Sequence, residues 1–197
     1  ETEKGKMALQ NRKDGNRKTD QEQHKRYKKV LGEAAGSFRE FVTKKYEDPE
    51  GYEWLKQQYH ETNYVNQFKQ RLAEGNVNTR IQKAKQLEHT QGTKSLQNRM
   101  KQAFKSQRDP TLPREKKQTP QSYLYKQINA QELVNRYAGK GLITYRQGSG
   151  TVREWITVEK PIGRCYNQGT GRYEETHRVC IIYHERKGTH VFPVKEK

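Results

Sequence analysis

The sequence predicts an α+β fold, in which a basic helical or extended N-terminal region is followed by a small domain of one helix and an antiparallel sheet. Two observations lead to this prediction. Of the 197 residues, 29% are hydrophobic and 32% are charged, so the chain can bury only a small core. The runs typical of strands are concentrated beyond residue 120. We therefore expect a compact C-terminal part joined to a solvated N-terminal part.

Residues 1–30 are predicted to form a flexible basic arm. This segment is rich in Lys, Arg, Gln and Asn and contains almost no aliphatic residues. Because it has so few apolar side chains to bury, nothing offsets the conformational entropy that ordering would cost. We expect a linker or an extended arm here.

Residues 31–80 are predicted to form short amphipathic helices that connect the arm to the domain. Apolar side chains recur there at helical spacing, and Pro49 with Gly51 separates the first helix from the next. The positions concerned are Phe38, Phe41, Val42, Trp54, Leu55, Tyr59, Tyr64, Phe68 and Leu72. Since the chain does not open with Met, we expect it to be part of a longer polypeptide on which these helices pack.

Residues 81–197 are predicted to form the folded domain. A polar stretch and a proline-bearing loop lead to SYLYKQ, which predicts a strand, and then to a helix. Asn129 is the expected N-cap, Glu132 its capping-box partner and Gly139 the C-terminal stop. Four runs rich in Val, Ile, Thr and aromatic residues follow: TVREWITV, PIGRCY, YEETHRVCIIY and THVFPV. They predict an antiparallel meander.

Most of the positive charge lies in this domain. Residues 1–80 hold 17 basic and 13 acidic side chains, a net charge of +4, whereas residues 81–197 hold 23 and 10, a net charge of +13. Such a charge attracts polyanions, and nucleic acid is the commonest of these. The sequence has no apolar run of transmembrane length, so no membrane partner is expected. Cys165 and Cys180 have no metal-binding spacing and are expected to be reduced thiols.

The last hairpin determines where His190 lies. If ERKG closes the turn, Tyr183 is opposite His190 and His184 is opposite Thr189. Tyr183 and His190 would then share one face, although a one-residue bulge would exchange the two faces. An imidazole with the usual pKa of about 6.5 can both accept and donate a proton at cellular pH. The alternative is that His190 is a packing residue of the last strand.

Polar residues in and near the predicted sheet have the types that metal-independent RNA cleavage needs. That reaction requires a base for the ribose 2′-OH, an acid for the departing 5′-oxygen and a cation for the phosphorane. The candidates are Arg153 and Glu154 in TVREWI, Thr176 and His177 in EETHRV, and His89 and Thr93 in EHTQGT. Motifs for Mg²⁺ carboxylates, a P-loop or a nucleophile elbow are missing from the sequence. Arg153 and Glu154 also suit an ordinary strand with exposed charges.

These residues resemble a known family. EHTQGT, ELVNRYAGKG, REWI and GTHVFP resemble the polymorphic toxin type 50 domain, over roughly residues 80–195. Such domains occur on bacterial toxins and at the C-terminus of minor head proteins of tailed phages. The resemblance implies a helix packed on a curved antiparallel sheet, within the barnase, EndoU, colicin and RelE group of small metal-independent ribonucleases. Residues 30–60 also resemble the segment before the C-terminal domain of phage minor head proteins.

The resemblance also implies a site. The two histidine positions of the family fall on His89 and His190, and its polar sheet positions fall on Arg153, Glu154 and Thr176. The residues expected to contact RNA are Thr93, Lys94, Lys140, Arg146, Tyr183, His184 and Lys187. No metal and no cofactor are expected. The expected partners are RNA, DNA through the basic surface, phage head or portal proteins, and an inhibitor protein, with the protein located on the virion or in the host bacterial cytoplasm.

Two classes of function follow from the sequence. The first is a metal-independent endoribonuclease, a toxin or effector, in which His89 and His190 exchange protons and Arg153 holds phosphate. The second is a non-enzymatic nucleic-acid-binding or head-assembly module of a phage particle, which uses only the positive charge and the exposed aromatic side chains. Cleavage of RNA in the presence of EDTA separates the two classes.

Overall fold

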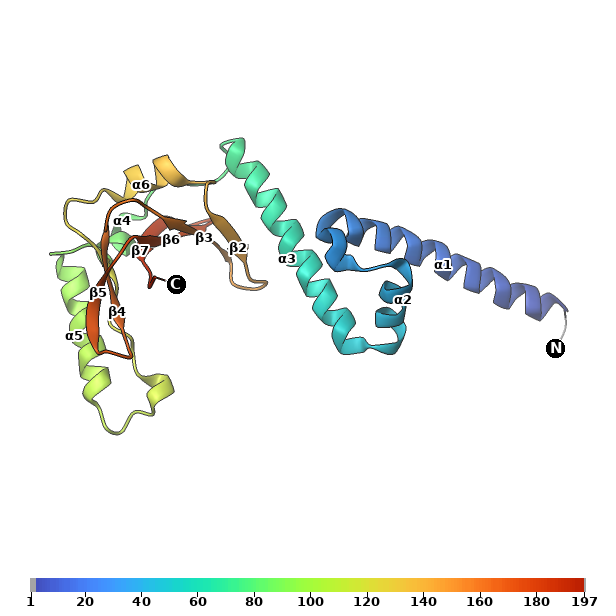
Figure 1. Cartoon of the computed structure of the whole chain (residues 1–197), viewed down its shortest axis with the longest axis horizontal. Helices are drawn as coiled ribbons and strands as arrows, with labels where there is room; N and C mark the ends of the chain where they lie inside the picture. Colours follow the sequence, from blue (N-terminus) through green and yellow to red (C-terminus); the bar gives the residue numbers. More distant parts are fainter. Residues whose placement is uncertain (1–2, 197) are drawn as a thin grey trace. The chain divides into compact units, whose positions relative to one another are not determined.

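The computed structural model describes residues 3–196, with side chains from residue 15 onward, and forms two compact units that divide between Asn66 and Gln67. The fold is α+β as predicted, with helices in both units and two antiparallel sheets in the second (Figure 1). Over the described range, no helix combines the length and the apolar content needed to cross a membrane.

The first unit is a group of helices around a small aromatic core. Its elements are α1 (Glu3–Leu31), the 3₁₀ turn η1 (Gly32–Ala35), α2 (Phe38–Glu47) and the first part of α3 (Pro49–Ala73). Tyr27, Phe41 and Leu55 are buried in this core. Tyr27 stacks on Tyr59 with the ring centroids 4.3 Å apart. Aromatic and aliphatic side chains therefore share the packing in this unit.

The segment predicted to be an extended arm is helical from Glu3 onward, which corrects that prediction; Glu1 and Thr2 lie outside the described residues. The C-terminal half of α1 gains contacts that its composition does not indicate. Asp20 is buried and accepts hydrogen bonds from Lys45 at 2.7 Å and from Tyr46 at 3.0 Å. Together with Tyr27, this buried carboxylate anchors a helix that has few aliphatic side chains.

Local signals in the sequence mark the starts of α2 and α3. The Ser37 hydroxyl accepts from the Glu40 N–H at 3.3 Å, and the Glu40 carboxylate accepts from the Ser37 N–H at 2.7 Å, which is a capping box. Pro49 is the first residue of α3, a position where a missing N–H costs nothing. α3 is one helix of 25 residues rather than two short ones, since no Pro or Gly interrupts it after Gly51.

The second unit contains two antiparallel sheets instead of the single predicted meander. The larger sheet has the strand order β2 (Leu142–Tyr145), β3 (Thr151–Thr157), β6 (Arg178–His184), β7 (Gly188–Pro193). The smaller sheet has the strand order β1 (Tyr123–Leu124), β4 (Gly163–Asn167), β5 (Arg172–Thr176). The run YEETHRVCIIY splits at His177, where the chain changes its partner from β4 to β3. The prediction also omitted β2.

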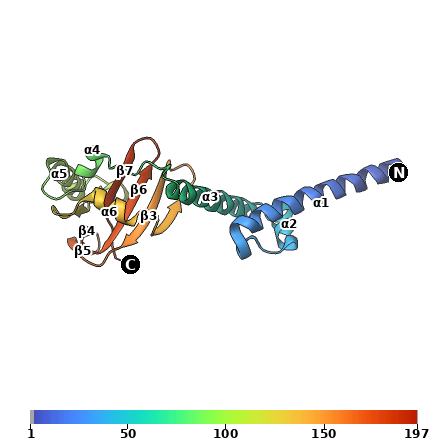
Figure 2. The ribbon, with the colours of Figure 1, turned by 90° about the horizontal axis from the view of Figure 1, so that it is seen from above.

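One face of the four-stranded sheet is covered by helices, and we call it the covered face. It carries buried residues such as Glu154, Ile181 and Val191. α6 (Ala130–Tyr137) packs against β7 (Figure 2), and Phe68 of α3 contacts the ring of Tyr183, with the centroids 5.1 Å apart. The opposite face, which we call the open face, carries Leu142, Arg153, Trp155, Ile182 and His190.

α6 starts at the predicted cap. The Asn129 side chain accepts from the N–H groups of Gln131 and Glu132 at 2.9 and 3.3 Å. The Glu132 carboxylate accepts from the Asn129 side-chain amide rather than from its backbone N–H, so the capping box is only half formed. The helix ends before Gly139, which has a φ of 84°.

The register of the last hairpin differs from the prediction by one residue. His190 is opposite Ile182, Tyr183 is opposite Thr189 and His184 is opposite Gly188. Three residues form the turn, and Gly188 has a φ of 86°, as is common in three-residue hairpin loops. Because a shift of one residue exchanges the faces, His190 lies on the open face and Tyr183 on the covered face.

The outer edge of β7 is covered by the chain that precedes His89. Ile81 forms a parallel bridge with Thr189, and the Gln86 side chain both donates to the Val191 carbonyl and accepts from its N–H at 2.8 Å. Gln86 belongs to α4 (Lys83–Leu87), which precedes α5 (Lys94–Arg108) and the 3₁₀ turn η2 (Arg114–Lys116). These bonds fix residues 81–89 against the strand that carries His190.

Candidate active site

His89 follows α4 and is held through its backbone and its side chain. Its N–H donates to Gln86 at 2.9 Å, and its carbonyl accepts from the N–H of Leu124 in β1 at 2.8 Å. The ring Nδ1 is 2.9 Å from the Ser122 carbonyl oxygen, to which only a protonated nitrogen can donate. This bond assigns the proton to Nδ1 and leaves Nε2 as the nitrogen that titrates.

The rings of His89 and His190 are stacked. Their centroids are 5.8 Å apart and their planes differ by 15°. Phe192, two residues along β7, lies 5.2 Å from His89 and 6.0 Å from His190. The structure therefore brings together, at the β7 end of the open face, the two histidines that the sequence analysis selected.

Both imidazoles are neutral at pH 7 in the free protein. The pKa of His190 is lowered to about 4, mainly by burial and in addition by the neighbouring His89 and Lys85. Burial also lowers the pKa of His89, although its hydrogen bond to Ser122 opposes this shift. The expectation of an ordinary pKa for His190 is therefore wrong. A phosphate at the pair would favour the protonated forms and raise both pKa values.

Three charged side chains that the sequence analysis missed lie beside the pair. The Lys85 ammonium is 2.7 Å from the Glu88 carboxylate, and Arg99 Nε is 3.3 Å from the same carboxylate without hydrogen-bond geometry. Lys85 and Glu88 affect the pKa of both histidines. The spacing in KAKQLEH carried a signal for Lys85, since residues four apart share one side of a helix.

Arg153 and His184 share the open face with His190 but do not contact its ring. Arg153 is opposite Ile182, which is itself opposite His190, so two strand spacings of about 10 Å in total separate the backbones of Arg153 and His190. Arg153 is exposed. His184 uses Nδ1 to accept from the N–H groups of Arg186 and Lys187 at 3.3 and 3.2 Å, and thereby closes the hairpin turn.

Glu154 and Tyr183 lie on the covered face, away from the histidines. Glu154 is 0% exposed and accepts from the N–H groups of Gly139 and Gly141 at 3.0 and 2.6 Å and from the Tyr183 hydroxyl at 2.5 Å. Burial and this last bond raise the pKa of Tyr183. The carboxylate fixes the connection between α6 and β2, and both of its oxygens are engaged in doing so.

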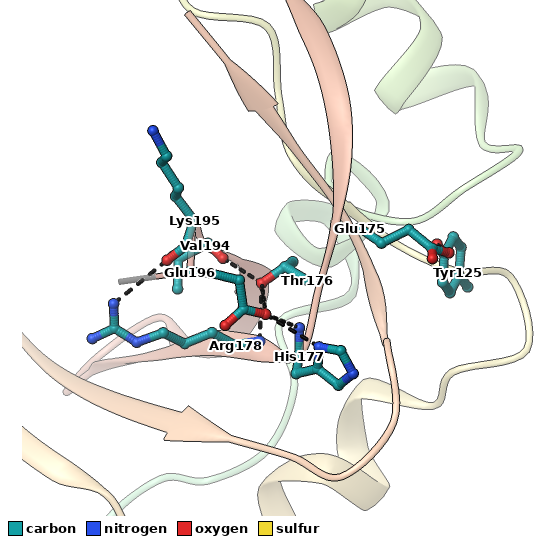
Figure 3. Close-up of polar contacts among 8 residues, drawn as sticks. All are labelled: Tyr125, Glu175, Thr176, His177, Arg178, Val194, Lys195 and Glu196. Atoms are coloured by element: carbon teal, nitrogen blue, oxygen red, sulfur yellow. Dashed lines mark hydrogen bonds and ion pairs between the residues drawn. The ribbon is translucent and has the colours of Figure 1, made fainter. Parts of the chain in front are cut away.

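Thr176 lies at the end of β5, in the smaller sheet, and is buried. Figure 3 shows its hydroxyl bonded to the Val194 carbonyl at 2.7 Å and to the Arg178 N–H at 3.0 Å. Beside it, the Glu196 carboxylate accepts from the His177 N–H at 2.6 Å, and this bond is the main cause that lowers the pKa of Glu196. These groups fasten the corner between β5 and β6 to the C-terminal segment.

The other residues expected to contact RNA are dispersed. Thr93 caps α5, since its hydroxyl accepts from the Leu96 N–H at 3.2 Å. The remaining exposed cations lie at the start of α5, after α6, in the β2–β3 turn and in the last hairpin turn: Lys94, Lys140, Arg146 and Lys187. Among the residues that the structure describes, no group of three or more His, Cys, Asp or Glu side chains is arranged to hold a metal ion. Both cysteines are free thiols.

The fold and the site together define an α+β domain that presents a stacked histidine pair on the open face of its four-stranded sheet. Residues 81–193, more than half of the chain, match the family described as bacterial toxin 50. The chain therefore belongs to the bacterial toxin 50 family, and its C-terminal part is a toxin domain of the polymorphic type. No curated protein and no solved structure gives a significant match.

Proposed function

We propose that the toxin domain is a metal-independent endoribonuclease that uses His89 and His190 for general acid–base catalysis. The observation that carries this proposal is the stacked pair, with ring centroids 5.8 Å apart on the open face of a domain with an excess of basic side chains. Stacked rings at this separation can address two oxygens of one phosphodiester. The toxin family adds support, because cutting RNA disables a cell.

The environments of the two rings suggest different roles. Burial lowers the pKa of His89, but the Ser122 carbonyl and Glu88 oppose this shift and favour the protonated form, so we assign His89 as the acid that protonates the departing 5′-oxygen. His190 has a pKa of about 4, so its neutral form predominates above that pH and can act as the base for the 2′-OH. The 2′-oxygen forms a bond to phosphorus as the bond from phosphorus to the 5′-oxygen breaks. The products are a 2′,3′-cyclic phosphate and a 5′-hydroxyl.

A cation near the pair would stabilise the phosphorane. Lys85 is the best placed of the described cations, since it affects the pKa of both histidines. In the free protein it is paired with Glu88, an arrangement that keeps the ammonium in position before the phosphate arrives. Arg153, farther along the same face, suits the binding of a neighbouring phosphate.

The setting of the toxin domain is a further part of the proposal. The resemblance of residues 30–60 to a segment of phage minor head proteins favours a location on a phage particle, from which the domain would reach the host bacterial cytoplasm. Phage head or portal proteins and an inhibitor protein would then be partners. Detection of the chain in purified phage particles by mass spectrometry tests this setting.

One observation favours a second candidate, a nucleic-acid-binding or head-assembly module without catalysis. A buried His89 stacked on Phe192 and a His190 with a pKa of about 4 also suit two neutral packing residues. In that case the basic surface would bind RNA and DNA alike, since contacts between basic side chains and phosphates do not require the 2′-OH.

The test is incubation of the purified chain with total RNA in excess EDTA, followed by analysis of the new ends. The proposal predicts cleavage that survives the chelator, leaves 2′,3′-cyclic phosphate ends and spares DNA of the same sequence. Binding of RNA and DNA without cleavage of either would instead support the second candidate.

A further inference from the structure

A row of apolar side chains lies next to the histidines on the open face. Register places Leu142, Trp155, Cys180 and Phe192 in one line across β2, β3, β6 and β7, which are neighbours in the sheet (Figure 1). Phe192 contacts His89 at one end of the line. At the other end Leu142 is 61% exposed, although large apolar side chains are usually covered where they cluster. The row thus runs from the candidate active site to an uncovered apolar end.

Trp155 is held in a fixed position within this row. Its indole N–H donates to the Thr144 hydroxyl at 3.1 Å. The Arg178 guanidinium lies 5.4 Å from the ring centroid, and Arg178 also donates to the Lys195 carbonyl at 3.5 Å. The ring is only half-buried. A fixed, partly exposed aromatic ring beside two arginines, Arg153 and Arg178, is the arrangement with which proteins bind bases of single-stranded nucleic acid.

We infer that Trp155 and Leu142 form a subsite for a base of single-stranded RNA, which stacks on the indole while the phosphate backbone crosses toward His89 and His190. This inference rests on the proposed function for the identity of the nucleic acid. Trp155 is separated from Phe192 by two strand spacings, about 10 Å, which is within the reach of a short oligonucleotide. Arg153 lies two residues from Trp155 on the same strand and is opposite Ile182, which is opposite His190, so it can hold a phosphate beside the path between the base and the histidines.

The simpler alternative is that Trp155 only covers the sheet. Cys180, directly opposite it, is 0% exposed, so the indole does contribute to the core. Covering Cys180 does not account for Leu142, which remains exposed next to the indole, or for the cations on both sides. The two explanations differ in whether RNA changes the environment of the indole.

Intrinsic fluorescence tests the inference directly. The chain has two tryptophans, so Trp54→Phe leaves Trp155 as the sole reporter. The probe is a 2′-O-methyl RNA oligonucleotide, which cannot be cleaved by attack of the 2′-oxygen, and binding is followed in parallel by fluorescence anisotropy of a labelled copy. The subsite predicts quenching of Trp155 that saturates with binding. Inorganic polyphosphate, which has charge but no bases, should bind without this quenching.

Substitutions then separate stacking from packing. Trp155→Leu should weaken binding of the oligonucleotide about 5-fold to 100-fold, and Trp155→Phe, which keeps an aromatic face, should restore most of the affinity. Thr157→Ala, an exposed position one row farther from the histidines, is the matched control and should bind like the parent chain. Melting temperatures show whether each variant is folded.

The inference is overturned if the oligonucleotide binds without quenching Trp155, if polyphosphate quenches equally, or if the oligonucleotide does not bind. It is also overturned if Trp155→Phe binds as weakly as Trp155→Leu. RNA cleavage is measured separately. A chain that binds with quenching but never cleaves RNA would refute the proposed nuclease and leave the base subsite standing.

Discussion

His89 and His190 have different surroundings although their rings are stacked. The Ser122 carbonyl and the Glu88 carboxylate both favour a proton on His89. For His190, burial is the largest cause of its lowered pKa, His89 and Lys85 add to this shift, and Glu88 opposes it. Environments that drive two titratable groups apart are the usual way in which one site obtains both an acid and a base. The different roles proposed for His89 and His190 therefore follow from their surroundings, since the residue type is the same.

The low pKa of His190 predicts a loss of stability in acid. Its pKa is about 4 in the folded protein and about 6.5 when unfolded, so the unfolded chain takes up a proton first as the pH falls. The free energy of unfolding should be unaffected by this group above about pH 6.5 and should fall by about 3 kcal/mol between there and pH 4. Urea unfolding of the wild type and of His190→Gln at about pH 7 and pH 4.5 measures this loss.

Carboxylates titrate in the same pH range, but they are common to both chains, so the difference between wild type and His190→Gln isolates the histidine. The variant should lose less stability on acidification than the wild type. Parallel losses in the two chains would mean that His190 has an ordinary pKa.

Substitution of Lys85 tests the cation at the site. Lys85→Ala should reduce kcat/KM by about 10² or more, because a positive charge near the phosphorane is lost. It should also raise the pKa values of His89 and His190, which Lys85 lowers, and so shift the rate profile to higher pH. The matched control is Lys160→Ala, which removes an exposed lysine from the turn after β3. An unchanged rate and pH profile for Lys85→Ala would rule out this role.

At the scale of elements, buried side-chain hydrogen bonds fix two places, the segment before His89 and the connection between α6 and β2. The Gln86 side chain and the bridge at Ile81 fasten the segment before His89 to the edge of β7. On the covered face, the Glu154 carboxylate holds the connection from α6 to β2, where a Cβ on Gly141 would lie 2.4 Å from the Trp155 carbonyl oxygen. Buried polar groups that satisfy backbone N–H groups in this way stabilise one arrangement of the chain.

Glu154 is accordingly predicted to be structural. Glu154→Gln replaces one accepting oxygen with a donor, which leaves a buried N–H or the Tyr183 hydroxyl without its acceptor and should cost about 1–3 kcal/mol of stability. The folded fraction should cleave RNA at the wild-type rate. Thermal unfolding and cleavage measured on one preparation check both parts, with Tyr183→Phe as the control that removes one of the three bonds. A stable Glu154→Gln without activity would return Glu154 to the catalytic set.

Local signals in the sequence located several elements, whereas the choice of His89 and His190 as a pair came from the family resemblance. Asn129, Ser37 and Pro49 act through neighbours a few residues away, so the starts of α6, α2 and α3 were predictable. The register of the last hairpin was not predictable, because Gly188 pairs with His184 as the first residue of β7, with a positive φ, instead of belonging to the turn. This shift of one residue places Tyr183 and His190 on opposite faces of the sheet. α1 is stabilised by contacts of Asp20 and Tyr27 with residues that are distant in the sequence. The composition of the helix itself does not reveal these contacts.

Glu154 and Thr176 show the limit of site prediction from residue type. Both are polar residues in strands, and the sequence does not indicate which strand residues have backbone N–H groups or carbonyls as buried partners. Lys85 was missed for the opposite reason, since a lysine in a short basic helix has no distinguishing pattern apart from its spacing to His89.

At the scale of the whole molecule, the chain joins a helical unit to a toxin domain with most of the positive charge. Binding of RNA should weaken steeply with salt, because contacts between basic side chains and phosphates release counterions. Filter binding over a range of salt concentrations measures the slope. Arg153→Glu on the open face should weaken binding more than Lys25→Glu in the first unit. A slope near zero, or equal effects of the two reversals, would contradict binding at the open face.

The most direct test of the account is the pH dependence of kcat/KM for RNA cleavage by the wild type, His89→Ala and His190→Ala, with the folded fraction of each measured on the same sample. Cleavage requires a neutral His190, above about pH 4, and a protonated His89, below its lowered pKa, so the wild-type optimum should lie between about pH 4 and pH 6.5. Each substitution should reduce kcat/KM by about 10²–10⁴. His190→Ala should lose the acid limb of the profile and His89→Ala the alkaline limb. Variants that retain the wild-type rate per folded molecule, or that keep both limbs, would contradict catalysis by the histidine pair.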